Sequence, residues 1–349
     1  MQNANVATRK SWIDTLKLFA MFFIYLTHFI SSYHSEYYSY WNRMPFSLIL
    51  NGLTGKLCVA FLGVCLGYFA FCSKEKNATK YILKRYFYFV ICGLFINTIR
   101  VILRSAGLMK FSYEATGFWN ICRDVLYESI TLGNGIYVTF WCIFPFFVSS
   151  VLAYMNGRAG VKAIGIIVQM ICFWMIKQTW ISICLLGALV AVLKEKDIVR
   201  KAGSKWWVRL LVVIGIFFVV KRKESNITYL IDGICSGLLL LVIEYSPPIQ
   251  QLLNRKFLAK QGETTMAIFL LHTVVYAIVG KYLFALMESF PYKIAFILTL
   301  IGCWTITVLI SIPVTKLLNR ILKLFSNVLN RAGIGKNGKE MTINASEAK

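Results

Sequence analysis

Long apolar segments set the strongest limit on how this chain can fold. Hydrophobic residues make up 58% of its 349 residues and charged residues 15%, with a mean hydropathy of +0.65. Ordinary soluble domains are about 45–50% apolar and about 25% charged. A membrane-spanning helix needs about 20 apolar residues, and ten segments approach this, at 13–33, 52–72, 86–104, 136–154, 160–176, 179–193, 207–220, 227–245, 264–286 and 293–315. We therefore predict an all-α polytopic membrane bundle with about ten transmembrane helices.

The distribution of basic residues predicts how this bundle is oriented. The net charge of +23 lies mostly in short loops between apolar segments, which is typical of the positive-inside rule. Nucleic-acid binding would need a continuous basic face, so no nucleic acid is expected as a partner. An even number of spans places both termini in the cytoplasm, although Lys221, Arg222 and Lys223 then fall outside.

This topology divides the chain into three parts. Residues 1–12 are predicted to be a cytoplasmic N-terminus, 13–318 a membrane domain and 319–349 a basic cytoplasmic tail. The chain after Pro313 has the composition of an amphipathic surface segment followed by disorder.

The ten cysteines do not predict a metal site or a disulfide framework. Most lie inside apolar segments, without a C-x-x-C pair or a Cys/His cluster. We interpret these cysteines as small apolar side chains buried between helices. We expect no metal and no permanently bound cofactor.

The first apolar segment carries three ionisable side chains, Asp14, Lys17 and His28. On a helix, Lys17 and His28 would lie about 16 Å apart along the axis and within about 20° around it. Ionisable groups in a membrane span usually face a cavity or the bundle interior. Asp14 is placed to pair with Lys17 on the same helix face. This stripe is the main candidate site, although a snorkelling lysine and a hydrogen-bonded core histidine remain alternatives.

Other ionisable residues are weaker candidates. Lys84 and Arg85 enter the third segment on the predicted cytoplasmic side, where they suit an anion or simply orient the helix. His272 lies inside the ninth segment, where it is either a residue of the site or a hydrogen-bonded histidine of the core. Arg100 and Arg104 share one face near the outer end of the third segment, where they suit an acidic acceptor or an interface anchor.

Four short patterns together resemble a known family. The run IDTLKLFAMFFIYLTH contains Ile13, Asp14, Lys17 and His28 in the order and spacing of the first-span signature of acyltransferase family 3. Gly67-Tyr68, Lys84-Arg85 and the segment GETTMAIFLLH at 262–272 are similar to later family motifs, and the resemblance extends over about residues 10–320. The chain departs from the family pattern at positions where serine or tyrosine is common, namely Leu66, Thr265, Met266 and Phe269.

The resemblance implies a membrane O-acyltransferase, most simply an acetyltransferase, that uses cytoplasmic acyl-CoA. The acceptor would be a hydroxyl of a cell-surface polysaccharide or its lipid-linked precursor, and the location a bacterial cell membrane. His28 would be the catalytic base or a covalent acyl carrier. Lys17, Lys84 and Arg85 would bind the donor, Asp14 and His272 would support them, and Arg100 and Arg104 would bind the acceptor.

A second function is compatible with the same composition. A transporter or flippase for a polysaccharide intermediate would also have many spans and intramembrane charges, but it does not explain the spacing of Lys17 and His28. The aromatic residues of segment 34–46 suit either a membrane interface or a carbohydrate-binding surface.

Overall fold

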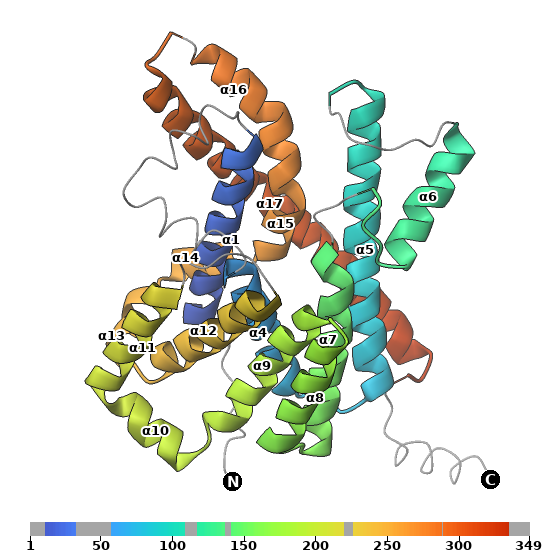
Figure 1. Ribbon diagram of the computed structural model, residues 1–349. Helices are drawn as coiled ribbons and strands as arrows, with labels where there is room; N and C mark the ends of the chain where they lie inside the picture. Colours follow the sequence, from blue (N-terminus) through green and yellow to red (C-terminus); the bar gives the residue numbers. More distant parts are fainter. Residues whose placement is uncertain are drawn as a thin grey trace, which may run out of the picture.

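The structure is a computed structural model that describes residues 11–32, 57–108, 117–136, 141–219, 226–287 and 289–334. Within these ranges the chain forms helices and no strand (Figure 1). The helices are α1 (Ser11–Ser32), α4 (Cys58–Phe71), α5 (Ala78–Ser105), α6 (Phe118–Ile130), α7 (Ile143–Ala159), α8 (Ala163–Met175), α9 (Thr179–Leu193), α10 (Asp197–Ser204), α11 (Trp206–Val219), α12 (Asn226–Glu244), α13 (Pro247–Leu253), α14 (Lys256–Gly262), α15 (Thr265–Val275), the π-helix η3 (Tyr276–Gly280), α16 (Lys281–Leu286) and α17 (Tyr292–Arg331).

Each predicted apolar segment overlaps one of these helices, or the continuous run from α15 to α16. Helices α1, α5, α12, α15–α16 and α17 are long and apolar enough to cross a membrane, and α4, α8, α9 and α11 are apolar but shorter. Helices suit this environment because they satisfy their backbone hydrogen bonds internally. The polytopic helical bundle confirms the predicted fold class. The number of crossings and the location of the termini stay predictions.

The contact between α4 and α9 is held by direct backbone approach. A Cβ atom added at Gly67 would lie 1.8 Å from the carbonyl oxygen of Cys184. One added at Gly187 would lie 2.0 Å from the carbonyl oxygen of Val64. Small residues at such positions let membrane helices pack closely. Gly67, which belongs to the family-like pair Gly67-Tyr68, therefore has a packing role.

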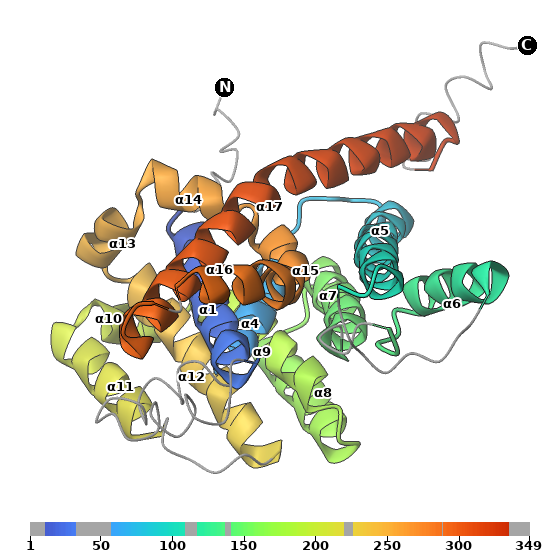
Figure 2. The ribbon, with the colours of Figure 1, turned by 90° about the horizontal axis from the view of Figure 1, so that it is seen from above.

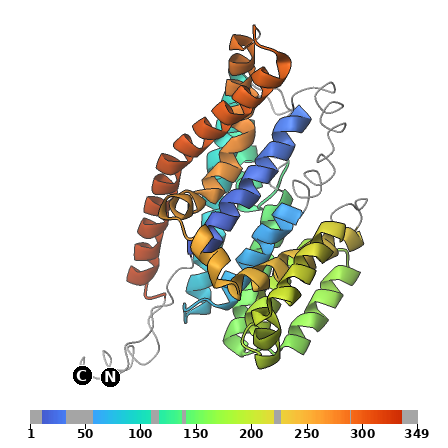
Figure 3. The ribbon, with the colours of Figure 1, turned by 90° about the vertical axis from the view of Figure 1, so that its left-hand side faces the viewer.

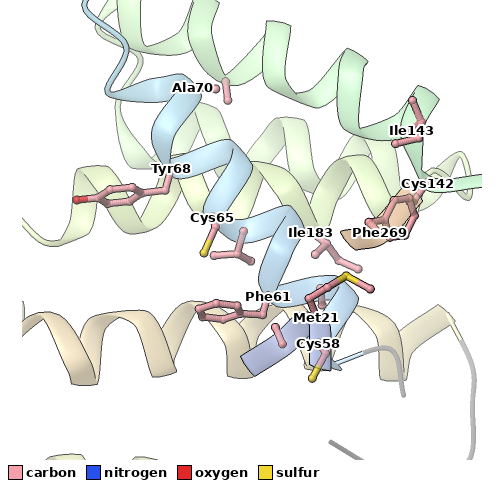
Figure 4. Close-up of a cluster of buried hydrophobic side chains, with 14 of the residues drawn as sticks. Met21, Cys58, Phe61, Cys65, Tyr68, Ala70, Cys142, Ile143, Ile183 and Phe269 are labelled. Atoms are coloured by element: carbon pink, nitrogen blue, oxygen red, sulfur yellow. The ribbon is translucent and has the colours of Figure 1, made fainter. Parts of the chain in front are cut away.

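Apolar side chains from several helices surround α4. Figure 4 shows Phe61 and Cys65 of α4 in one cluster with Met21 of α1, Ile183 of α9 and Phe269 of α15. All five side chains are buried. This core brings together the first, second, sixth and ninth predicted spans, which include segments from both ends of the chain.

Helix α17 does not end near Pro313. It spans 40 residues, Tyr292–Arg331, and passes through this proline. Residues on both sides of the boundary predicted between 318 and 319 therefore belong to one helix, and the boundary between membrane domain and tail stays a prediction. Proline removes one helix hydrogen bond, but packing and Ser or Thr side chains support such positions in membrane helices. Here the hydroxyl of Ser311 donates to that of Thr264 over 2.9 Å. The basic segment is thus a helical extension that runs along one side of the bundle, opposite α10 and α11 (Figures 2 and 3).

Alanine at Gly187 is expected to destabilise the protein by about 1–3 kcal/mol, because its methyl group would overlap the backbone of α4. The matched control is Gly215→Ala on α11, where an added Cβ meets nothing within 4 Å. There alanine should be neutral or stabilising by up to about 1 kcal/mol, through its higher helix propensity. Thermal unfolding of both purified variants measures the difference, and equal effects would contradict the proposed packing.

Candidate functional site

The charged end of the site is formed within α1. The ammonium group of Lys17 lies 2.6 Å from the carboxylate of Asp14, three residues earlier. The Asp14 side chain is 4% exposed and that of Lys17 is 21% exposed. Nearby, the Lys17 ammonium lies 5.8 Å from the centre of the Phe69 ring. The predicted pairing of Asp14 with Lys17 is therefore present, in a largely desolvated position.

Helix α14 encloses this ion pair. A Cβ atom added at Gly262 would lie 1.9 Å from the carbonyl oxygen of Asp14. Only glycine allows the two backbones to approach so closely. Gly262, which opens the late family-like segment, thus positions the charged end of α1.

Two histidines from different helices meet at the other end of the site. The rings of His28 on α1 and His272 on α15 lie 5.3 Å apart between centroids. His272 is fully buried, whereas His28 is half-buried. The sequence placed each histidine in its own span, and the structure brings them together.

A backbone hydrogen bond fixes the tautomer of the neutral His272 ring. Its Nδ1 lies 2.7 Å from the carbonyl oxygen of Phe269. A carbonyl only accepts, so Nδ1 carries the hydrogen and the neutral ring leaves Nε2 unprotonated. Nε2 is buried and has no hydrogen-bond partner among the described residues. The neutral form of His272 therefore has its unprotonated nitrogen at Nε2, in a ring next to that of His28.

A cavity of about 280 Å³ lies between the charged end and the histidines. Lys17 and Arg85 line it, as do Ile24 and Phe269. Ile24 is one helical turn before His28, and the Phe269 ring lies 5.9 Å from that of His272. The cavity thus extends from the cations to the level just below the histidine pair.

The structure separates the remaining predicted cations. Arg85 lines the cavity with Lys17, whereas Lys84 lines only a neighbouring groove. Arg100 and Arg104 lie near the other end of α5, with Arg100 about 22 Å along the axis from Arg85. Arg100 is buried one turn after Asn97, whose side-chain amide donates to Ser129 of α6 over 3.1 Å. The two arginines therefore lie apart from the cavity.

Several cavity residues were not predicted from the sequence. All four positions that depart from the family pattern, Leu66, Thr265, Met266 and Phe269, line the cavity, and at three of them a hydroxyl is lost. Ile24 also lines it, at the helical spacing that continues the stripe from Lys17. That spacing was a usable signal for Ile24, and the departures from the family pattern were a signal for the other four residues. The aromatic segment 34–46 lies outside the described residues.

Comparison with protein families identifies the family of the chain. A family model described as an acyltransferase domain, acyltransferase family 3, matches residues 10–308. The chain belongs to this family. The match includes α1 with Lys17 and His28, the cavity and α15, and it ends within α17. No curated protein and no solved structure matches the chain.

Family membership and the apolar helices together identify a multi-pass membrane acyltransferase. The chemistry of this acyltransferase is the transfer of an acyl group. Its bilayer environment explains why the ionisable groups of α1 face the bundle interior.

Asp14→Asn is expected to lower the free energy of unfolding by about 1–3 kcal/mol, because it leaves Lys17 largely buried without its counter-charge. Adding Lys17→Met should restore part of this loss, since the double variant removes both charges. The matched control is Asp197→Asn, which removes the carboxylate of another i,i+3 pair, with Arg200, whose side chains are 73% and 67% exposed. It should change stability by less than about 1 kcal/mol. Thermal unfolding in lipid nanodiscs tests this, and a double variant less stable than Asp14→Asn would contradict the assignment.

Proposed function

We propose that this acyltransferase moves an acetyl group, or another acyl group, from cytoplasmic acyl-CoA to a hydroxyl of a cell-surface polysaccharide or its lipid-linked precursor. The location that suits this role is a bacterial cell membrane. The observation that supports it most is the cavity with two cations at one end and two histidines just beyond the other.

The cations suit the phosphate-bearing part of the donor. Lys17 and Arg85 line the cavity at the end that the positive-inside pattern assigns to the cytoplasm. Charge-assisted hydrogen bonds to phosphate are strong, and they strengthen where water is scarce. Asp14 holds the Lys17 ammonium in place. The donor phosphates would be anchored here, with the acyl thioester extending along the cavity.

The cavity walls suit the reactive thioester. Beyond the cations they are mostly apolar, and Leu62, Phe146 and Phe269 contribute to them. Excluding water protects a reactive group from hydrolysis while it waits for its acceptor. The acyl carbonyl would then lie close to the histidine pair.

His28 is the proposed general base. The acceptor oxygen forms a bond to the acyl carbon as its proton passes to a ring nitrogen of His28. The bond between that carbon and sulfur breaks, and the thiolate leaves as CoA and takes up a proton. Such a base contributes about 10²–10⁴-fold to the rate. The unprotonated Nε2 of His272 can accept a hydrogen bond from the protonated His28, which makes His272 a positioning residue.

His28→Ala is expected to reduce acylation of the surface glycan by about 10²–10⁴-fold, because it removes the base. The protein should remain in the membrane, because His28 is only half-buried. Mass spectrometry of glycans from cells with the wild-type or variant protein measures the acyl increment. An immunoblot of the membrane fraction checks that both proteins are present in equal amounts. Unchanged acylation would contradict the assignment of His28 as the base.

Lys17→Met is expected to raise the KM for acyl-CoA by about tenfold, because one charge-assisted contact to phosphate is lost. The kcat should change less, because Lys17 lies about 16 Å from the base along the helix. Lys76→Met is the matched control, as an exposed lysine on the same predicted side of the membrane. Acyl transfer by purified protein in nanodiscs separates KM from kcat, and equal KM values for both variants would remove Lys17 from the donor site.

A further inference from the structure

A groove of about 690 Å³ lies between the first turns of α5 and the C-terminal half of α17. Ligand sites commonly have volumes of about 300–1,000 Å³. The family match ends at residue 308, so the α17 side of this groove is formed by a part of the chain outside it. Figure 2 shows this half of α17 continuing past α5.

The α5 wall presents one face of a helix. Tyr81, Lys84, Arg85 and Tyr88 line the groove, at the i, i+3, i+4 and i+7 positions that share a face. The Arg85 guanidinium lies 5.9 Å from the centre of the Tyr81 ring. The Tyr81 hydroxyl is buried and has no hydrogen-bond partner among the described residues. This wall therefore offers two cations to the groove.

The α17 wall is also one helical face, and it is mostly polar. Asn319, Lys323, Ser326 and Asn327 line the groove at matching helical spacing. Beside them, Phe325 stacks on Phe87 of α5, with ring centroids 3.7 Å apart and planes 20° apart. This stack fastens the extension to α5 and holds Lys323 opposite Lys84 and Arg85.

The charge of the groove favours a polyanion. Lys84, Arg85 and Lys323 oppose a single carboxylate, that of Glu75. The Glu75 carboxylate also accepts the backbone N–H of Asn77, at 3.4 Å. Three cations with amide and hydroxyl donors between them match several phosphate groups in one ligand.

The groove adjoins the inner cavity. Arg85 and Tyr88 line both. If one end of a ligand is bound in the groove, the rest of the ligand can therefore pass Arg85 into the cavity, towards Lys17. A phospholipid headgroup offers the same phosphate chemistry, but its acyl chains belong in the bilayer rather than in this cavity.

We infer that the helical extension of α17 completes the donor site, with Lys323 binding the 3′-phosphate at the nucleotide end of coenzyme A. This rests on the proposed use of acyl-CoA and adds a specificity-determining residue to it. The outermost phosphate of the donor lies in the groove, its diphosphate lies at Arg85 and the thioester arm enters the cavity.

The test compares CoA with 3′-dephospho-CoA, using full-length protein in neutral phosphatidylcholine nanodiscs and isothermal titration calorimetry. Lys323→Ala is expected to weaken CoA binding by about three- to tenfold, the range for one exposed charge-assisted contact. It should leave binding of 3′-dephospho-CoA within about twofold of wild type. Lys316→Ala is the matched control, because Lys316 is an exposed lysine of α17 that does not line the groove. Lys316→Ala should leave the affinities for CoA and for 3′-dephospho-CoA unchanged.

Each other outcome identifies a specific failure. Equal loss for both ligands, or no loss for either, would overturn the role of Lys323 while leaving the proposed donor intact. Unchanged CoA binding, together with weaker binding of Lys323→Ala to phosphatidylglycerol vesicles, would assign the groove to a lipid headgroup and overturn the inference. If the wild-type protein binds neither CoA nor 3′-dephospho-CoA, the proposal that acyl-CoA is the donor is overturned.

Discussion

The site depends on a lysine held in a largely desolvated position near the start of an apolar helix. An ammonium group removed from water needs a counter-charge, and Asp14 supplies it at 2.6 Å from Lys17. The two residues meet wherever α1 forms, because they are three apart on one helix. Their burial depends on α14, since Gly262 lies against the Asp14 backbone. Once this end of α1 is held, the pitch of the helix places His28 on the same stripe, about 16 Å away.

The bundle turns this stripe into a path with different chemistry at its two ends. The cations line one end of the cavity, apolar side chains form most of its walls, and the histidine pair lies just beyond Ile24 and Phe269. The proposed transfer from acyl-CoA would benefit from such an arrangement, because it separates phosphate recognition from the reacting carbonyl and surrounds that carbonyl with apolar side chains. Membership of acyltransferase family 3 fixes the reaction class. The direct backbone contact of α4 with α9 supports the walls of the cavity, since α4 contributes Leu62, Cys65 and Phe69 to it.

Much of the fold could be predicted from the length of the apolar segments, because a bilayer leaves helices as the natural solution for such sequences. The same pattern of apolar segments said less about how the helices contact one another. The chain after Pro313 was predicted to begin an amphipathic surface segment, and in the structure it is the second half of the continuous helix α17. Phe325 in this half stacks on Phe87 of α5, a contact between separate helices that the local sequence does not specify. Helix α6, which none of the predicted spans covers, is joined to α5 through a hydrogen bond from Asn97 to Ser129.

The candidate site was likewise predictable from the sequence only in part. The sequence alone determined the relative positions of Asp14, Lys17 and His28, because residues on one helix keep their spacing whatever surrounds them. Tertiary structure decided which other residues join them. It placed His272 beside His28, Arg85 with Lys17 in the cavity, and Lys84 in the neighbouring groove. Those choices depend on how separate helices pack and rotate against one another, which the periodicity of a single segment does not specify.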